Sequence, residues 1–455
     1  MKHKIRKKPG SGAGKTSNAG PAELRKKLNF AVRQHQAGRV QKARKIYNKI
    51  LKANPLHTDT LHMLGLLEHQ SGDNDTAIRL LNRAKEQGPA SAELLTNLGS
   101  ALQARRIFNE AIKAFQQAIE LSPGFELAYN NLGNALRAVG NQDAAASAFQ
   151  SAIKIYPNYA LAHFNLGDLL HAQGRYDEAI ASMKRALALE PEFADASNSL
   201  AVLYMKKGDT GEAINIFRRI LELDKDNASA RHLLAALEGQ ASTETPSDYV
   251  VELFDGYAAS FEHHLTGKLE YQTPQKLYDA VEEFIRDRQS ELDVIDLGCG
   301  TGLCGPLFRK HASSLKGVDL SPGMLVRAKE RNIYDELVEG DLTVGLGTAR
   351  DVYDVVIAAD VFVYVGELRQ VFEATVRTLR PGGLFAFSLE AEEGSDDFVL
   401  RPTGRYAHSI GYMRRLAQAA GLRELRLEES VLRMEKGQPI DGYIVVLGKP
   451  GVGNL

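Results

Sequence analysis

Val-Ile-Asp-Leu-Gly-Cys-Gly-Thr-Gly, at positions 294–302, joins a short apolar run to three glycines at 298, 300 and 302. An apolar run of this length is typical of a strand buried in a parallel sheet. Glycines directly after a strand let a ligand approach the backbone closely, and a helix is predicted from about Leu303. A dinucleotide-binding fingerprint would place its third glycine at 303. The spacing therefore argues against a dinucleotide-dependent oxidoreductase.

Two acidic residues follow the next two strand regions. Asp319 lies near the end of a strand predicted over 315–320, and Asp341 follows the third strand region. A carboxylate in the first position can accept both hydroxyls of a ribose. One in the second position could accept from the exocyclic amine of an adenine. The alternative for both residues is a carboxylate that caps a turn or a helix.

Strands and helices alternate from residue 249 onward. We predict strands over 292–297, 315–320, 354–359, 384–389, 423–433 and 443–447, and helices near 274–288, 303–310, 322–331, 368–379 and 406–420. This alternation predicts a mainly parallel sheet with helices on both faces. The short connection between the last two strands predicts an antiparallel hairpin.

With these motifs, residues 249–449 resemble the class I S-adenosylmethionine-dependent methyltransferases. The resemblance implies an α/β Rossmann-like domain over 249–450, with a seven-stranded sheet that ends in the antiparallel hairpin. It implies S-adenosylmethionine as cofactor, bound by Tyr257, Asp296, Gly298, Gly300, Gly302, Asp319, Leu320, Met324, Asp341, Leu342, Ala359 and Asp360. By the same resemblance, Asp296 and the glycines would hold the methionine part, Asp319 the ribose and Asp341 the adenine edge.

The residues that meet the methyl acceptor are less well defined. Tyr364 follows the fourth strand and indicates either a partly apolar acceptor pocket or ordinary packing. Arg405, Tyr406 and His408 form a polar group in a predicted loop. We expect Arg405 and Tyr406 to contact substrate, and His408 and Tyr364 to be the catalytic candidates. A histidine at a helix start or on the surface is the alternative for His408. No spacing of acids and histidines predicts a metal site.

The first half of the chain repeats itself every 34 residues. Leu-Gly pairs begin at 64, 98, 132 and 166, Leu-Ala follows at 200, and prolines recur at 55, 89, 123, 157 and 191. A small residue where two helices cross permits a close approach, and an aromatic or aliphatic residue fills the groove opposite. The pattern predicts helical hairpins.

This period resembles the tetratricopeptide repeat over residues 22–239. It implies an all-α superhelix at 21–239, with six repeats and a capping helix at Ala228–Glu238. Asn97, Asn131 and Asn165 each precede a Leu-Gly pair, so we expect them to line a groove that binds a protein or peptide. The alternative is that asparagine is common at this position and faces water.

Charge is distributed unevenly, although the formal net charge is only −1. Residues 1–54 carry a net +15, residues 55–240 a net −5, and residues 241–455 a net −11. The acidic C-terminal half disfavours nucleic acid as acceptor. The basic residues 1–20 predict a disordered tail, 240–248 a linker, and 451–455 a short tail.

Two cysteines cannot build a disulfide framework, and no apolar run approaches 18 residues. We therefore expect a reducing, cytoplasmic compartment and no membrane span. The leading interpretation is an S-adenosylmethionine-dependent methyltransferase whose repeats recruit a protein or peptide partner. One alternative is a methyltransferase of small or carrier-bound substrates whose repeats serve assembly only. The other is a non-catalytic adaptor.

Overall fold

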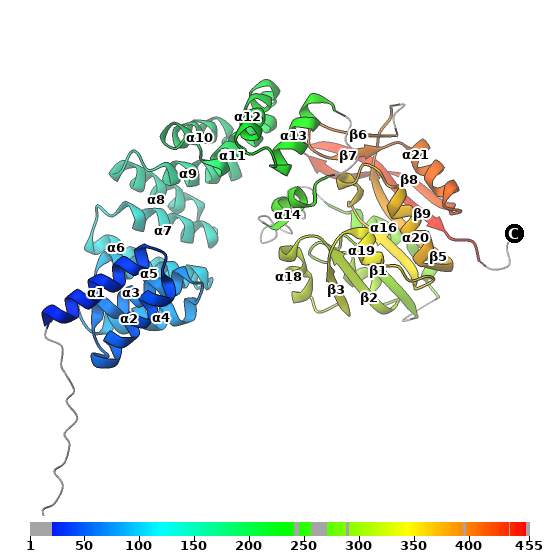
Figure 1. The fold of residues 1–455 in the computed structure, drawn as a ribbon. Helices are drawn as coiled ribbons and strands as arrows, with labels where there is room; N and C mark the ends of the chain where they lie inside the picture. The colour runs from blue at the N-terminus through cyan, green and yellow to red at the C-terminus, as the bar shows by residue number, and fades with distance from the viewer. Residues whose placement is uncertain are drawn as a thin grey trace, which may run out of the picture. The chain divides into compact units, whose positions relative to one another are not determined.

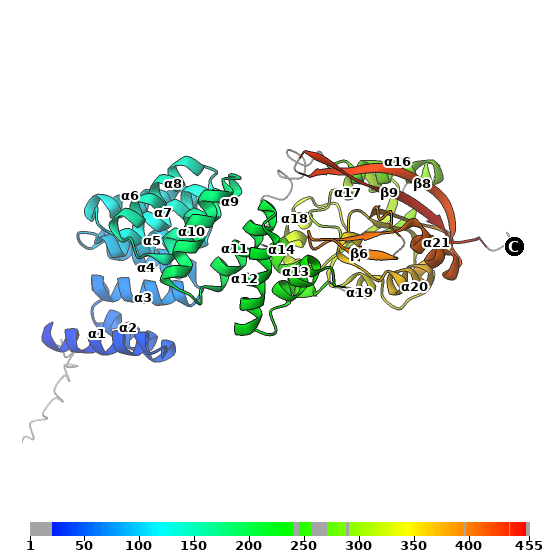
Figure 2. The same cartoon turned by 90° about the horizontal axis from the view of Figure 1, so that it is seen from above.

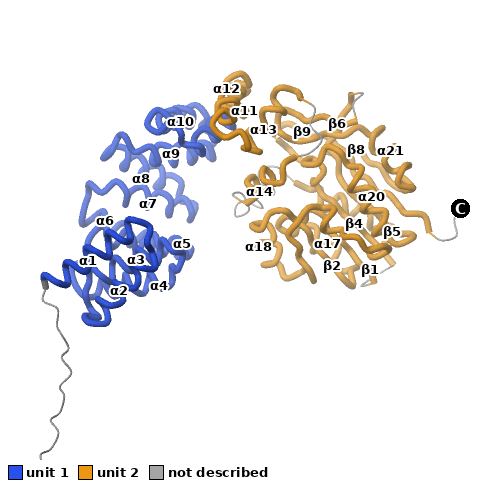
Figure 3. Tube along the Cα trace, in the orientation of Figure 1, with its two compact units in different colours: residues 1–203 blue, residues 204–455 orange. Residues whose placement is uncertain are grey.

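The fold is that of a computed structural model, which describes residues 21–240, 245–255, 271–287, 291–394, 397–435 and 437–451. The chain divides into two compact units, residues 1–203 and 204–455 (Figure 3). The boundary falls inside helix α11 (Ala194–Lys207), so the last helices of the repeat region group with the strands. All of the described strands lie in the second unit.

The repeat region consists of paired helices, as the 34-residue period predicts. The pairs are α1 (Pro21–Gln36) with α2 (Val40–Ala53), α3 (Thr58–Gln70) with α4 (Asn74–Glu86), α5 (Ala92–Ala104) with α6 (Phe108–Leu121), α7 (Glu126–Ala138) with α8 (Gln142–Ile155), and α9 (Ala160–Ala172) with α10 (Tyr176–Leu189). Helices α11 and α12 (Thr210–Leu223) come next along the chain. Helix α13 (Ala228–Glu238) follows α12.

The glycines of the Leu-Gly pairs lie where the two helices of a hairpin touch. A Cβ atom at Gly99 would come within 2.6 Å of the Phe115 ring, and one at Gly133 within 2.5 Å of the Phe149 ring. Both rings are fully buried. The repeat therefore needs glycine for close packing rather than for backbone freedom.

A seven-stranded sheet forms the centre of the second unit (Figures 1 and 2). The order of its strands is β3-β2-β1-β4-β5-β9-β8. Its strands are β1 (Leu292–Leu297), β2 (Ala312–Asp319), β3 (Glu336–Glu339), β4 (Tyr353–Ala358), β5 (Leu379–Glu390), β8 (Arg423–Glu435) and β9 (Gln438–Gly448). The first five run parallel, and β9 pairs antiparallel with both β5 and β8. The predicted seven strands and closing hairpin are confirmed.

Two apolar cores cover the faces of this sheet. On one face, α19 (Leu342–Leu346), α20 (Arg369–Thr378) and α21 (Ile410–Ala419) pack against side chains such as Ile295 and Phe385. On the other, α16 (Thr273–Ile285) and α17 (Gly305–Phe308) pack against neighbours such as Val294. Adjacent residues of β1 thus enter opposite cores, which explains its unbroken apolar run.

The helix predicted over 406–420 is wrong at its start. Tyr406–His408 form strand β7, which pairs antiparallel with β6 (Phe398–Leu400) in a separate two-stranded sheet. The helix α21 begins only at Ile410, because Ser409 caps it: the Ser409 hydroxyl accepts from the Tyr412 amide at 3.2 Å. The helix predicted over 303–310 shortens to α17 (Gly305–Phe308), because residues 301–304 form turns and bends.

Candidate functional site

A cavity of about 500 Å³ opens at the carboxyl ends of β1, β2 and β4. This is where ligands bind in open α/β sheets, and the volume is in the range of small-molecule sites. Ten of the twelve predicted cofactor residues line it: Asp296, Gly298, Gly300, Asp319, Leu320, Met324, Asp341, Leu342, Ala359 and Asp360. Gly302 is not among the lining residues, and Tyr257 lies outside the described residues.

The glycine turn after β1 requires glycine for two reasons. Gly298, Gly300 and Gly302 all adopt positive φ, at 64°, 54° and 85°. In addition, a Cβ at Gly298 would lie 2.5 Å from a methyl carbon of Val361, and one at Gly302 would lie 2.9 Å from the Tyr334 ring. A larger residue would therefore strain the backbone at all three positions, and at 298 and 302 it would also collide with Val361 or Tyr334.

Asp319 connects the end of β2 to this turn. Its Oδ2 accepts from the Gly300 amide at 2.8 Å, and its Oδ1 accepts from the Ser321 amide at 2.9 Å. Burial raises the pKa of the carboxyl, although these amide bonds oppose the rise. Asp319 is thus held rigidly in the cavity wall with its orientation fixed by backbone.

Asp296 is the most deeply buried acid of the cavity, with 1% of its surface exposed. The Tyr334 hydroxyl donates to its Oδ2 at 2.7 Å. Burial raises the pKa of Asp296 to about 7, and the nearby Asp319 charge adds to the rise. A cationic group bound beside Asp296 would favour its ionised form.

Asp341 has the capping role that its position in the sequence left open. Its Oδ1 accepts from both the amide and the hydroxyl of Thr343 at 2.8 Å, at the start of α19. Asp341, Leu342 and Thr343 also line the cavity. One carboxylate therefore begins a helix and faces the site.

The short helix α14 (Ser247–Asp255) supplies one wall of the cavity. Its residues Ser247, Val250, Leu253 and Phe254 line the cavity. Asp255 accepts from the Ser321 hydroxyl at 2.5 Å and from the Gly323 amide at 2.9 Å, which connects α14 to the start of α18 (Pro322–Glu330). An acid at the end of a short amphipathic helix gives no sequence signal of such a contact.

The four predicted acceptor-side residues divide into two pairs. Tyr364 and Arg405 line the cavity. Tyr406 and His408 are fully buried and are not among the lining residues. Both residues belong to strand β7, which pairs with β6, and this placement keeps their side chains out of the cavity.

His408 is not placed to act as the general base that we expected from the sequence. Its Nε2 lies 2.9 Å from the Val365 carbonyl and 3.0 Å from that of Gly366, so it donates to backbone. Burial lowers the pKa of His408 to about 4. An imidazole that is buried, bonded to carbonyls and reluctant to take a proton is a packing residue.

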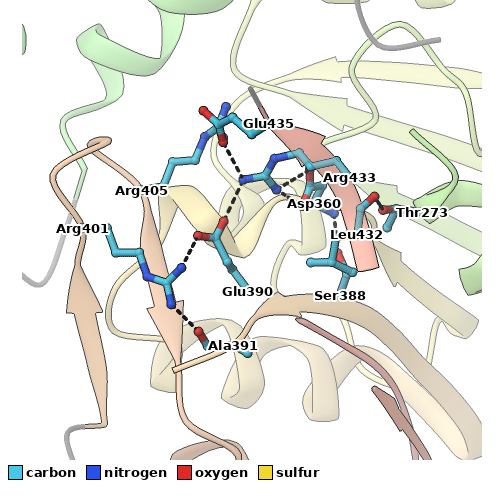
Figure 4. Close-up of polar contacts among 10 residues, drawn as sticks. All are labelled: Thr273, Asp360, Ser388, Glu390, Ala391, Arg401, Arg405, Leu432, Arg433 and Glu435. Carbon is cyan, nitrogen blue, oxygen red and sulfur yellow. Dashed lines mark hydrogen bonds and ion pairs between the residues drawn. The ribbon is translucent and has the colours of Figure 1, made fainter. Parts of the chain in front are cut away.

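A charged network that the sequence did not reveal adjoins the cavity (Figure 4). Arg433 is only 3% exposed; it contacts both oxygens of Asp360 at 3.2 Å and donates to Glu390 at 2.7 Å. Asp360 has φ 58°, and its amide donates to the Ser388 hydroxyl at 2.7 Å. Buried charges are retained when they are paired, and a cavity wall is where such networks often serve function.

In the first unit, the three asparagines predicted to line a groove contact side chains of the preceding repeat. Asn97 Nδ2 lies 2.8 Å from His62 Nε2, and Asn131 donates to the Ser100 hydroxyl at 3.3 Å. Asn165 is buried and donates to Asn130 at 2.8 Å. The structure therefore places Asn165 inside the repeat packing and not on an open groove, while Asn97 and Asn131 are half-buried.

Within the described ranges, no group of three or more His, Cys, Asp or Glu is arranged to hold a metal ion. A search of those same residues finds no helix with the length and apolar character needed to cross a membrane.

Comparisons with known proteins assign both parts of the chain. Residues 295–387 match a family model described as a methyltransferase domain, and two tetratricopeptide repeat models match segments between 34 and 237. Malonyl-[acyl-carrier protein] O-methyltransferase of Pectobacterium atrosepticum is 32% identical over 103 residues, 23% of this chain and 40% of the relative. An 18S rRNA (guanine-N(7))-methyltransferase of Bos taurus is 38% identical over 53 residues, 12% of this chain and 19% of the relative. These matches span less than half of each relative.

Among solved structures, MamA is 32% identical, with a TM-score of 0.33 over 36% of this chain and 96% of MamA. A tetratricopeptide repeat protein of Thermus thermophilus is 26% identical, with a TM-score of 0.34 over 40% of this chain and 98% of that protein.

Proposed function

We propose that this chain, which combines tetratricopeptide repeats with a methyltransferase domain, transfers a methyl group from S-adenosylmethionine to an acceptor that the repeats recruit or present. The observation that carries the proposal is the bond between Asp319 and the Gly300 amide in the cavity wall. It joins the glycine turn to a carboxylate in the position suited to a ribose. The match of residues 295–387 to a methyltransferase domain supports the same assignment.

The residues of the cavity fit this cofactor. Asp296 offers a buried carboxylate, and Asp319 a half-buried one, to a ligand with an ammonium and a sulfonium group. Leu320 and Met324 offer apolar contact for an adenine. S-adenosylmethionine supplies a methyl group that its positive sulfur already activates. The protein's contribution is to align the acceptor with that methyl group, which can lower the barrier by about 7–11 kcal/mol.

The acceptor end needs no strong base under this proposal. Tyr364 is the catalytic candidate that remains in the cavity wall, since His408 is buried elsewhere. Arg405 and Arg433 line the same region and make it polar. If the acceptor must lose a proton, Tyr364 is the group placed to accept a hydrogen bond from it.

We assign the recruiting role to the repeats, with a protein or peptide as the partner. A second candidate is a carrier-bound substrate, which the similarity to a malonyl-[acyl-carrier protein] O-methyltransferase favours. The net −11 of residues 241–455 opposes a nucleic-acid acceptor, because phosphates would be repelled. A cytoplasmic location is part of the proposal, and both cysteines are free in the structure.

Two measurements test the proposal. Calorimetry with S-adenosylmethionine should show binding to the wild type and weaker binding to Asp319→Ala. No binding to the wild type would refute the methyltransferase assignment and leave a non-catalytic adaptor. Transfer of labelled methyl groups in a cell extract then separates the two acceptors. Label that stays in polypeptide after cleavage of thioesters supports a protein acceptor, whereas label in small molecules, or label that thioester cleavage releases, contradicts it.

A further inference from the structure

The helix that closes the repeat array touches a turn of the methyltransferase domain, inside the second compact unit. His232 of α13 is 3% exposed, and its Nε2 lies 2.9 Å from the carbonyl oxygen of Gly404. Its ring packs against Tyr249 of α14, with ring centroids 4.8 Å apart. A residue predicted to belong to the repeats thus contacts a loop 172 positions further along the chain.

Glycine at 404 permits this contact. Gly404 has φ 79°, and a Cβ there would come within 2.9 Å of Leu233 Cδ2 and 3.1 Å of the Tyr249 hydroxyl. The turn is closed on itself as well, because the Gly404 amide donates to the Arg401 carbonyl and the Arg401 amide donates to the Arg405 carbonyl, each at 2.8 Å. The backbone of residues 401–405 is therefore held by hydrogen bonds within the turn and by the contact with His232 of α13.

The two ends of this turn carry arginines that enter the charged network of Figure 4. Arg401 donates to Glu390 at 3.0 Å, and Arg405 donates to Glu435 at 3.0 Å. Arg433 lies between these two acids, 2.7 Å from Glu390 and 3.9 Å from Glu435. Arg405 and Arg433 both line the cavity, so displacement of the turn would alter the cavity wall.

We propose that His232 is a positioning residue for Arg405. By holding the Gly404 carbonyl, the last helix of the repeat array fixes Arg405 in the wall of the methyl-acceptor site. The catalytic consequence rests on the proposed function, whereas the structural link does not. The functional boundary between repeats and enzyme thus lies before α13 and not in the 240–248 linker.

The protonation of His232 is set by its surroundings. A carbonyl only accepts, so Nε2 carries the hydrogen. Nδ1 is buried and has no hydrogen-bond partner among the described residues, and burial lowers the pKa of the ring. The side chain therefore acts as a neutral donor. A glutamine amide can supply the same donor, but leucine cannot.

Four single variants and one double variant, all full-length, test the link. His232→Leu removes the donor, and His232→Gln restores it. Arg231→Gln is the control on the same helix, because Arg231 is an exposed residue that donates to the Lys225 carbonyl. Arg405→Gln, alone and combined with His232→Leu, shows whether the histidine acts through the arginine.

The first measurement is hydrogen–deuterium exchange, which needs no acceptor. His232→Leu should raise exchange at least tenfold in residues 398–408 while β1 and β4 keep wild-type rates. His232→Gln should return to within threefold of the wild type, and Arg231→Gln should show no change. Unchanged exchange in 398–408, or a uniform rise across the domain, would overturn the proposal. If His232→Leu does not fold, His232→Asn tests the same bond, because its amide is too short to reach Gly404.

The second measurement is labelled methyl transfer to cell extract, beside calorimetry with S-adenosylhomocysteine. His232→Leu should lower transfer about tenfold with the dissociation constant within twofold of the wild type. The double variant with Arg405→Gln should lose no more than Arg405→Gln alone. Additive losses would contradict action through Arg405. Absence of transfer by the wild type would refute the proposed function instead, and the exchange result would still decide the structural link.

Discussion

The Asp319 carboxylate and the Gly300 amide are 2.8 Å apart, so a side chain at the end of β2 holds the glycine turn that follows β1. The other oxygen of Asp319 accepts from the Ser321 amide. Both oxygens therefore face N–H donors, and the site needs an acceptor at each position. Only a carboxylate among side chains of this size provides that.

Asp319→Asn is expected to weaken S-adenosylmethionine binding tenfold or more. The asparagine NH2 group must face either Gly300 N–H or Ser321 N–H, donor against donor, and a bond to a charged group is worth about 1.5–3 kcal/mol. Calorimetry measures the change. Asp335→Asn is the matched control, because Asp335 also accepts from a backbone amide, that of Leu315 at 2.8 Å, but does not line the cavity. Equal losses in the two variants would contradict a specific role for Asp319.

Gly298→Ala is expected to abolish cofactor binding and to destabilise the second unit. The alanine would adopt φ 64° and place its Cβ 2.5 Å from Val361. Gly421→Ala separates the cost of backbone strain from the cost of the collision, because Gly421 has φ 73° but open space around it. The backbone strain alone should cost about 1–2 kcal/mol. Thermal unfolding should thus show a larger loss for Gly298→Ala than for Gly421→Ala. Similar losses would mean that Val361 gives way.

The raised pKa of Asp296 predicts that the free energy of unfolding depends on pH. Its pKa rises to about 7 in the folded protein from an ordinary value of 3.8, so the folded state holds the proton more tightly than the unfolded state. This contribution is fully present below about pH 4 and is lost as pH rises through about 7, and its size is on the order of 4 kcal/mol. Asp296→Asn, which stays neutral, should flatten the decline in unfolding temperature between pH 5 and pH 8.

At pH 8 the asparagine variant should be more stable than the wild type, yet bind S-adenosylmethionine more weakly, because it offers no charge to a cationic ligand. Asp335→Asn serves again as control. The pKa of Asp335 is lowered by the Leu315 amide and by Arg309, so its contribution is already complete at pH 5. That variant should lose stability equally at both pH values. A wild type whose stability does not fall between them would contradict the assignment of Asp296.

Local sequence predicted those parts of the site that the topology of a parallel sheet brings together. The turn at 298–302 follows β1 and Asp319 ends β2. Because neighbouring parallel strands end at one edge of the sheet, their meeting could be expected. Arg433 and His232 gave no such signal. Their partners lie 43–73 and 172 positions away, and nothing in the spacing of charges or histidines indicates those contacts.

His408 shows why a polar cluster misled the sequence analysis. Histidine beside arginine and tyrosine in a short segment is typical of a loop, where functional residues gather. Here Tyr406–His408 form β7, and a strand of three residues is too short for alternation to be recognised. Pairing with β6 then buries the imidazole against backbone carbonyls. The pairing of β7 with β6 therefore determines where His408 lies, and local sequence does not indicate that pairing.

Gly133→Ala is expected to destabilise the first unit, although alanine favours a helix over glycine by about 0.5–1 kcal/mol. The new Cβ would lie 2.5 Å from the Phe149 ring, which is fully buried. Overpacking of this kind costs about 1–3 kcal/mol, so it outweighs the helical gain. Circular dichroism during thermal unfolding measures the net effect, and cofactor binding should not change.

Gly124→Ala provides the contrast, because a Cβ at Gly124 meets no atom within 4 Å. The double variant Gly133→Ala/Phe149→Leu should lose less stability than the sum of its single variants, since the smaller side chain relieves the collision while the new methyl group fills part of the space. If Gly133→Ala instead raises the unfolding temperature, the Phe149 ring yields and the helical gain of alanine outweighs the collision. The 34-residue Leu-Gly period would then need a different physical explanation.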